Sequence, residues 1–222
     1  MATLVIVAHP DLDASQSQQF LQQAGQIEGV TWHHLDAITN LNVAQERQLL
    51  RQHQRIILQF PLYWYAAPAS LKSWQDQVLT NNFLSSLHDK ELALVVTTGL
   101  PQSAFRMGGA AHFSLDQFLL PYRAWGLQAQ MKFLPTFAIY QFAYYDEIAQ
   151  LQLLSDYRRY LTQTAPDSLL NRSYWFLNQL PKTNQDDGQL ILAEYLEQRT
   201  QELEGLQDTL RLIKMNEEEA NV

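Results

Sequence analysis

Three short, mainly apolar runs constrain the fold of this 222-residue chain more than any other feature. They span residues 4–8, 55–60 and 92–97, and each is followed within two residues by a proline or a glycine. Continuous apolar runs of this length are typical of strands that are buried on both faces, as in a parallel sheet covered by helices. We therefore expect a sheet with helices on both of its faces.

Weaker strand patterns and helical patterns complete this interpretation. Further strands are expected over residues 30–35 and 133–140, although Pro135 interrupts the second one. Amphipathic patterns predict helices at residues 15–26, 44–53, 68–80, 114–125 and 147–161. Strands that alternate with helices predict a doubly wound α/β fold. A sheet of five parallel strands favours the flavodoxin-like order over the six-stranded dinucleotide fold.

The last quarter of the chain differs from the rest. Residues 166–180 carry the aromatic patch Tyr174-Trp175-Phe176, residues 181–188 resemble a linker, and residues 189–215 are predicted to be helical. Apolar residues recur in this helix at spacings of three and four, with one interruption at Arg199: Leu192, Leu196, Leu203, Leu206, Leu210 and Ile213. The pattern fits either an amphipathic helix that packs on the body or a dimerisation helix. We expect a flavodoxin-like domain over residues 1–165 and a helical extension over residues 166–222.

Charge and cysteine content exclude several classes of protein. The net charge is −8, whereas proteins that bind nucleic-acid phosphates carry an excess of basic residues. Residues 186–222 hold ten acidic and three basic residues, a net charge of −7, so the body is nearly neutral. With no cysteine, a disulfide framework, a thiolate metal site and a Cys nucleophile are excluded. The six histidines match no metal-binding spacing, and we expect no metal and no nucleic-acid partner.

No targeting segment or membrane-spanning run is visible in the sequence. We therefore expect a cytoplasmic protein whose site lies outside the carboxyl ends of the strands, as in other open α/β sheets. The segments that follow the three apolar runs are the first places to search for functional residues.

The first of these segments is suited to an anion. His9, Ser15 and Ser17 lie where the chain enters a helix, and a helix N-terminus favours negative charge. The glycine patterns of nucleoside-triphosphate and Rossmann loops are missing, so a single terminal phosphate, or the phosphates of a bulkier cofactor, would fit. The alternative is structural, with Ser15 as a helix cap and His9 satisfied within the fold.

The second segment is unusually aromatic. Tyr63, Trp64 and Tyr65 stand between Pro61 and Pro68, which stiffen the loop. Flat rings on a stiff loop suit stacking on a planar ligand such as an isoalloxazine, a quinone or a nicotinamide. Alternatively the three rings cap the core, and the residues alone do not choose between these possibilities.

The third segment ends its strand with small residues. Backbone N–H groups at Thr98 and Gly99 could hydrogen-bond the pyrimidine edge of a flavin and stabilise negative charge there. The alternative is an ordinary mobile loop.

These segments contain three motifs. They are His-Pro-(x)4-Ser at residues 9–15, Pro-Leu-x-Trp-Tyr-(x)2-Pro-Ala-x-Leu-Lys-x-Trp at residues 61–74, and Thr-Thr-Gly at residues 97–99. Together they resemble the NAD(P)H:quinone oxidoreductase family. The similarity is greatest to short bacterial members that include the ancillary subunits of glutathione-gated potassium efflux systems. It covers about residues 3–162, so the C-terminal extension lies outside it.

The resemblance implies a flavodoxin-like fold, non-covalently held FMN or FAD, NAD(P)H as co-substrate, and a homodimer with sites at the subunit interface. It implies three groups of cofactor-binding residues. These are His9, Ser15, Ser17 and Gln18 on the phosphate side, Pro61, Leu62, Tyr63, Trp64 and Tyr65 along the flavin ring, and Thr98, Gly99 and Leu100 at its pyrimidine edge. Tyr65 and His112 are the expected catalytic residues.

Three positions depart from the pattern of the family. Gln18 replaces the usual Asn, Leu100 replaces a usual second Gly, and Phe105 falls where relatives often carry a Tyr. A phenylalanine cannot donate the proton or hydrogen bond that a tyrosine would. Either His112 or water would then take that role, or the activity would be weak.

The leading hypothesis is a flavin-dependent NAD(P)H:quinone-type oxidoreductase that transfers hydride in two steps to a quinone-like acceptor. One alternative is a redox-sensing regulatory subunit of a membrane potassium efflux transporter. The other is an interaction module on the same fold that has lost its cofactor.

Overall fold

The structure is a computed structural model that describes residues 1–164, 166–180 and 187–220. Most of the predicted linker, residues 181–186, lies outside the described residues. The chain divides into two units, Met1–Thr162 and Gln163–Val222, and each is described by itself.

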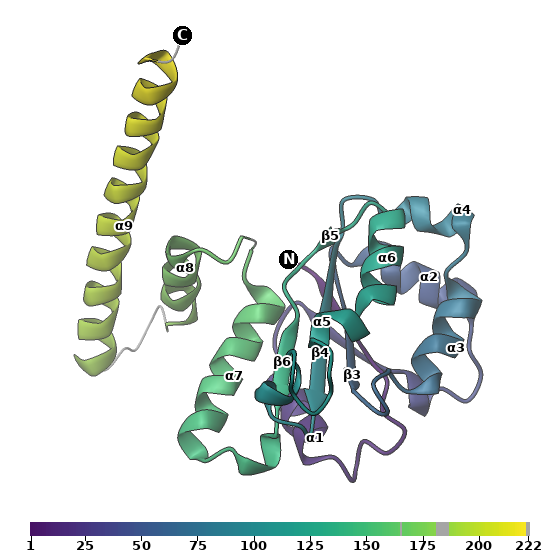
Figure 1. Cartoon of the computed structure of the whole chain (residues 1–222). Coiled ribbons are helices and arrows are strands. Elements are labelled where there is room, and N and C mark those ends of the chain that lie inside the picture. The colour runs from purple at the N-terminus through teal and green to yellow at the C-terminus, as the bar shows by residue number, and fades with distance from the viewer. Residues whose placement is uncertain (165, 181–186, 221–222) are drawn as a thin grey trace. The chain divides into compact units, whose positions relative to one another are not determined.

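A parallel sheet forms the centre of the first unit. Its strands are β1 (Thr3–Val7), β2 (Val30–His34), β3 (Arg55–Pro61), β4 (Glu91–Thr98), β5 (Lys132–Phe133) and β6 (Phe137–Tyr140). The strand order is β2-β1-β3-β4-β5, and β6 also pairs with β4 (Figure 1). All of these pairings are parallel, which confirms the flavodoxin-like fold class.

The predicted fifth strand is divided in two. Residues 133–140 were expected to form one strand, whereas β5 ends at Phe133 and β6 begins at Phe137. Pro135 stands between them and has no N–H group to donate to β4. Both pieces pair with the same neighbouring strand, so the break leaves the order of the sheet unchanged.

Helices cover both faces of the sheet (Figure 1). They are α1 (Gln16–Ala24), α2 (Val43–Gln52), α3 (Ala69–Val78), α4 (Asn81–Leu84), α5 (Leu115–Phe118), α6 (Leu120–Gln128) and α7 (Glu147–Thr162). The predicted helix over residues 114–125 is two helices, because Pro121 lies in the first turn of α6 and its fixed backbone angle suits a helix start. Short 3-10 turns link the elements at Leu35–Ala37, Ser85–Leu87, Gln102–Ala104 and Phe142–Tyr144.

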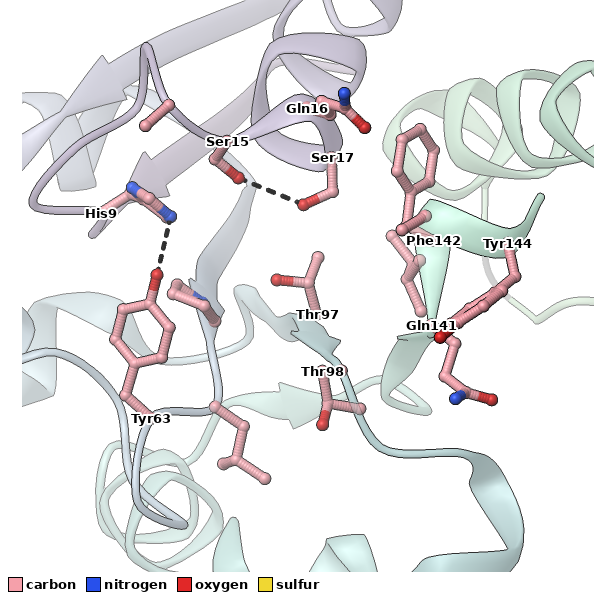
Figure 2. A pocket seen from close by; sticks show the side chains of 16 residues that line it. His9, Ser15, Gln16, Ser17, Tyr63, Thr97, Thr98, Gln141, Phe142 and Tyr144 are labelled. Carbon is pink, nitrogen blue, oxygen red and sulfur yellow. Dashed lines mark hydrogen bonds between the residues drawn. The ribbon is translucent and has the colours of Figure 1, made fainter.

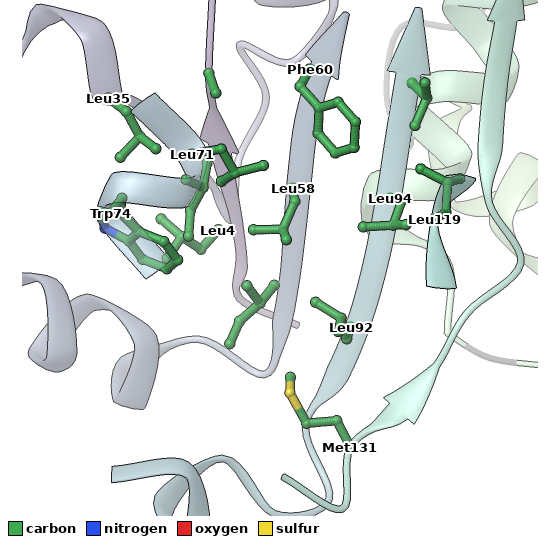
Figure 3. Packing of buried hydrophobic residues seen from close by; sticks show 14 of the residues in the cluster. Leu4, Leu35, Leu58, Phe60, Leu71, Trp74, Leu92, Leu94, Leu119 and Met131 are labelled. Atoms are coloured by element: carbon green, nitrogen blue, oxygen red, sulfur yellow. The ribbon is translucent and has the colours of Figure 1, made fainter. Parts of the chain in front are cut away.

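Two apolar cores result from the alternation of side chains along each strand. Leu4 and Ile6 of β1 face a core with α2 and α3, which includes Leu71 and Trp74 (Figure 3). Val5 and Val7 face the other core, to which α1 and α7 contribute. Because both faces are covered, the loops at the carboxyl ends of the strands are left to form a site.

The second unit consists of two helices, α8 (Leu169–Gln179) and α9 (Asp187–Ala220). The predicted aromatic patch lies on α8, where the Tyr174 hydroxyl donates a hydrogen bond to Glu204 of α9. Thr200 of α9 is buried, whereas Leu206, Leu210 and other apolar residues farther along the helix are exposed. Among the described residues, no helix is both long and apolar enough to cross a membrane.

Candidate functional site

The segment between β1 and α1 forms a helix start rich in hydroxyl groups. Ser15 is the N-cap of α1, and its Oγ accepts a hydrogen bond from the backbone N–H of Gln18 at 3.4 Å. Ser15 Oγ also lies 3.3 Å from Ser17 Oγ. The first N–H groups of a helix have no partner within it and can bind an anion. The structural role expected for Ser15 as a cap is therefore compatible with the anion site expected at the same helix start.

His9 is buried at the end of β1 and is held from several sides. Its backbone N–H donates to Asp36 Oδ2 at 2.8 Å, and its carbonyl accepts from His34 Nε2 at 2.9 Å. Its ring nitrogen Nδ1 accepts from the backbone N–H of Asp11 at 3.2 Å, and Nε2 lies 3.1 Å from the Tyr63 hydroxyl. Burial lowers the pKa of His9 below its usual value, although Asp36 acts in the opposite direction.

These contacts assign the proton on the His9 ring. A neutral imidazole has one donor and one acceptor, and Nδ1 is the acceptor toward Asp11. Nε2 therefore carries the proton and donates to the Tyr63 oxygen, which leaves the hydrogen of the Tyr63 hydroxyl to be donated elsewhere. Burial also raises the pKa of Tyr63, so this hydroxyl keeps its proton at neutral pH.

A strained turn carries the aromatic residues after β3. Tyr63 and Ala66 exchange backbone hydrogen bonds of 2.9 and 3.0 Å across the turn. Between them, Trp64 and Tyr65 have φ angles of 49° and 64°, a left-handed region that favours glycine or asparagine. Backbone strain of this kind is concentrated at functional sites, and here the surrounding prolines and hydrogen bonds maintain it.

A cavity of about 420 Å³ opens where these segments meet. This volume lies within the range of roughly 300–1,000 Å³ typical of small-molecule sites. In Figure 2, Ser15 and Ser17 lie at one end of the cavity, Thr98 lies toward the other, and Tyr144 stands at one side. The lining residues are His9, Ala14, Ser15, Gln16, Ser17, Pro61, Leu62, Tyr63, Thr97, Thr98, Gly99, Ile139, Gln141, Phe142, Ala143 and Tyr144.

The cavity brings together most of the predicted cofactor-binding residues. Those that line it are His9, Ser15, Ser17, Pro61, Leu62, Tyr63, Thr98 and Gly99. Thr98 Oγ1 accepts from the N–H of Leu100 at 3.2 Å and shapes the turn after β4. A Cβ added at Gly99 would meet no atom of the chain within 4 Å, so this part of the wall is open space.

Other predicted residues lie outside the lining. Gln18 is fully buried in the core, Leu100 is partly exposed, and Trp64 is 96% exposed. The Tyr65 ring stacks on Phe118 with 4.9 Å between centroids. The side chain of His112 is exposed in the loop after β4.

The structure explains two of the positions at which this chain departs from the family's pattern, Gln18 and Phe105. The Gln18 side chain points into the core, where it bonds to other side chains. Phe105 is also a core residue, in ring contact with Phe118 and Tyr140.

Sequence reasoning missed one wall of the cavity. Gln141, Phe142, Ala143 and Tyr144 follow β6, and Gln141 is tied to β4 by a 2.7 Å hydrogen bond from its N–H to the Thr98 carbonyl. The same rule about strand ends that located the other loops would have found this segment. The predicted fifth strand ends at Tyr140, as β6 does, but functional residues were sought only in the segments that follow the three apolar runs.

The comparisons with known proteins agree with this fold. A family model described as a flavodoxin-like fold matches residues 1–163. The chain belongs to this family. Among curated proteins, the glutathione-regulated potassium-efflux system ancillary protein KefG of Serratia proteamaculans is 36% identical over 146 residues, which cover 62% of this chain and 80% of KefG.

Two solved structures are similar as well. The NADPH-quinone reductase from P. pentosaceus has a TM-score of 0.71 at 44% identity, and the match covers 74% of this chain and 100% of that one. General stress protein 14 from Treponema denticola, solved in complex with FMN, has a TM-score of 0.66 at 28% identity, with 72% and 98% covered. The family match, residues 1–163, corresponds to the first unit, which contains the cavity.

Proposed function

We propose that the chain is an FMN-dependent NAD(P)H:quinone oxidoreductase. The observation that carries this proposal is that three segments line one cavity. They are the start of α1 with its hydroxyl groups, the Tyr63 turn and the end of β4. Two similar structures are named an NADPH-quinone reductase and a complex with FMN, which supports this cofactor and this donor.

The donor groups around the cavity suit FMN. Ser15, Ser17 and the N–H groups of the first turn of α1 would hold the phosphate, because they combine hydroxyl donors with the positive end of a helix dipole. Thr98 and Gly99 would hold the polar edge of the ring through backbone N–H groups. FAD shares these groups, and FMN is preferred because general stress protein 14 from Treponema denticola, a similar structure, is solved in complex with FMN. When bound, FMN supplies the hydride chemistry that this chain's side chains lack.

The chain's own residues contribute binding, orientation and exclusion of water. Tyr63 presents a hydroxyl proton toward a ligand, because His9 already donates to its oxygen. Phe142 provides an apolar surface that limits water on one side of the cavity. His112 and Tyr65 stay as proposed catalytic residues toward the quinone. Neither lines the cavity, so their substitution should change quinone turnover and leave FMN content unaltered.

A homodimer is part of the same proposal. The loops around the cavity expose large apolar side chains, including Trp64, Tyr144 and Ile148 at the start of α7. Exposed apolar side chains that come together in one patch are typical of protein–protein interfaces, and we propose that these three side chains take part in one. A second copy that covers these loops would complete a slot for nicotinamide and quinone. Light scattering should then report a dimer, and Trp64→Ser combined with Ile148→Ser should weaken it.

The similarity to KefG favours a second candidate function. KefG is named an ancillary protein of a potassium-efflux system, so this chain would report its redox state to a membrane transporter from the cytoplasm. Co-purification with a transporter of that class, in the presence and absence of NAD(P)H, separates this role from that of an independent enzyme.

The experiment that tests the main proposal is steady-state quinone reduction. We expect the FMN-loaded protein to oxidise NADPH or NADH faster when a benzoquinone is added. Replacing both Ser15 and Ser17 with alanine should lower FMN occupancy and activity together. Unchanged FMN occupancy in this variant would show that these hydroxyl groups do not hold the phosphate, whereas a wild-type protein that takes up no FMN would favour the cofactor-free interaction module.

A further inference from the structure

A row of buried polar side chains connects α7 to the cavity. The Tyr157 hydroxyl donates to Gln59 Oε1 at 2.7 Å, and Gln59 Nε2 donates to Gln18 Oε1 at 2.7 Å. Gln18 Nε2 then donates to Thr97 Oγ1 at 3.4 Å. Tyr157, Gln59 and Gln18 are fully buried, and Thr97 lines the cavity. We call these four residues the relay.

Tyr157 decides which group donates and which accepts in each hydrogen bond of the relay. Tyr157 is fully buried, and burial raises the pKa of its hydroxyl far above the usual value, so the hydroxyl keeps its proton. Gln59 is the partner that the described residues give this hydroxyl, so it donates to Gln59 Oε1, because its O–H would otherwise be buried without an acceptor. This choice places the oxygen of the Gln59 amide toward Tyr157 and its nitrogen toward Gln18. Gln18 is oriented in the same way, with its nitrogen toward Thr97.

This orientation of the two amides determines the role of the Thr97 hydroxyl. Its hydroxyl accepts a hydrogen bond from Gln18, so the proton of that hydroxyl is left to be donated. Figure 2 shows Thr97 between the Ser15–Ser17 end of the cavity and Thr98. A ligand that spans the cavity from an anion to a ring would place its connecting chain beside this hydroxyl.

We propose that Tyr157, Gln59 and Gln18 are positioning residues that orient the Thr97 hydroxyl as a donor to an oxygen in the chain that joins the FMN phosphate to its ring. This inference rests on the proposed function. It also assigns Gln18 a role through Thr97 in place of the direct phosphate contact that the resemblance implied.

The test is a double-mutant cycle with the FMN dissociation constant as its readout, measured by quenching of flavin fluorescence. Tyr157→Phe should weaken FMN binding about fivefold, the equivalent of one hydrogen bond. Thr97→Val should cause a similar loss, because it keeps the shape and removes the donor. In the Thr97→Val background, Tyr157→Phe should cause no further loss. Thr97→Ser keeps the hydroxyl and should retain both the binding and its sensitivity to Tyr157→Phe.

The matched control is Tyr160→Phe, three residues along α7. The Tyr160 hydroxyl donates to the Pro135 carbonyl at 2.7 Å and has no part in the relay. Its loss should lower stability in urea and leave FMN affinity unchanged in both backgrounds. Gln59→Met interrupts the relay at another point and takes the place of Tyr157→Phe if that variant does not fold.

The outcomes separate this inference from the proposed function. Equal losses from Tyr157→Phe in the wild-type and Thr97→Val backgrounds would mean a general structural effect and would overturn the inference. Unchanged affinity in folded Tyr157→Phe would overturn it too. If the wild-type protein bound no FMN, the proposed function would fail, and this inference with it.

Discussion

At the scale of single residues, the turn after β3 shows how the chain holds a side chain in an unfavourable conformation. Trp64 has a φ angle of 49° and is almost fully exposed, so packing within the chain does not compensate its strain. A left-handed conformation costs an L-residue roughly 1–2 kcal/mol, and asparagine tolerates it best after glycine. A tryptophan at this position therefore points to a use outside the folded monomer.

We expect Trp64→Asn to raise the free energy of unfolding by about 1 kcal/mol, because it relieves strain and removes no buried contact. Trp64→Ala removes the same ring and keeps the strain, so it is the matched control. Urea denaturation of the cofactor-free protein measures both variants. If the two variants had equal stability, the strain would not be located at this residue.

His9 makes stability depend on pH. Its pKa is lowered in the folded state by burial, so just below pH 6.5 the unfolded chain binds more protons than the folded one. The free energy of unfolding should therefore rise with pH through this window and fall on acidification. The His9→Gln variant should lose less stability than wild type between about pH 7.5 and pH 5.5 in urea titrations. Parallel losses in the two proteins would show that His9 is not the group responsible.

At the scale of elements, Glu46 connects the helices α2 and α3 and the strand β2. Its Oε2 accepts from His33 Nε2 of β2 at 2.9 Å and from Trp74 Nε1 of α3 at 2.8 Å, while Glu46 itself belongs to α2. Burial raises the pKa of this carboxyl, but the two hydrogen bonds outweigh burial and leave the pKa below its usual 4.5. Glu46 therefore stabilises the fold above pH 4.5, and this contribution is lost as the pH falls through its folded-state pKa.

Glu46→Gln should lower the free energy of unfolding at neutral pH by about 1–2 kcal/mol, because both hydrogen bonds lose their charged acceptor. The variant should also lose less stability than wild type when the pH drops below 4.5. The exposed Glu28→Gln serves as the control and should behave as wild type in both respects. Thermal unfolding across this pH range gives both quantities.

The elements also show what could be predicted from the sequence. Buried strands β1, β3 and β4 were predicted because both of their faces are apolar, and the site followed because their carboxyl ends meet at one edge. The Gln141–Tyr144 wall was missed although the last strand was expected to end at Tyr140, because only the segments after the three apolar runs were searched for functional residues. The direction of the Gln18 side chain depends on Gln59 and Tyr157, distant partners that no local pattern reveals.

At the scale of the whole molecule, the cavity belongs to the first unit and most of the charge belongs to the second. All of the lining residues precede residue 145, and α7 closes the first unit, with Thr3 Oγ1 of β1 donating to the Leu161 carbonyl at 2.7 Å. The net charge of −7 lies within residues 186–222. The acidity of the chain therefore concerns solubility or a partner of the second unit more than the ligand in the cavity.

We expect a chain that stops after Thr164 to fold and to bind FMN within about twofold of the full-length affinity, because no lining residue is removed. Fluorescence titration of the two proteins makes the comparison. A large loss of FMN affinity in the shortened chain would show that the second unit contributes to the site.

The most direct test of the central claim is an anaerobic titration of the purified, FMN-reconstituted protein followed by visible absorption. We predict that bound flavin shows its characteristic absorption, that NADPH or NADH bleaches it, and that a quinone then restores it. A protein that takes up no flavin, or whose bound flavin neither nicotinamide nucleotide can bleach, would contradict the proposal that this cavity is the site of an NAD(P)H:quinone oxidoreductase.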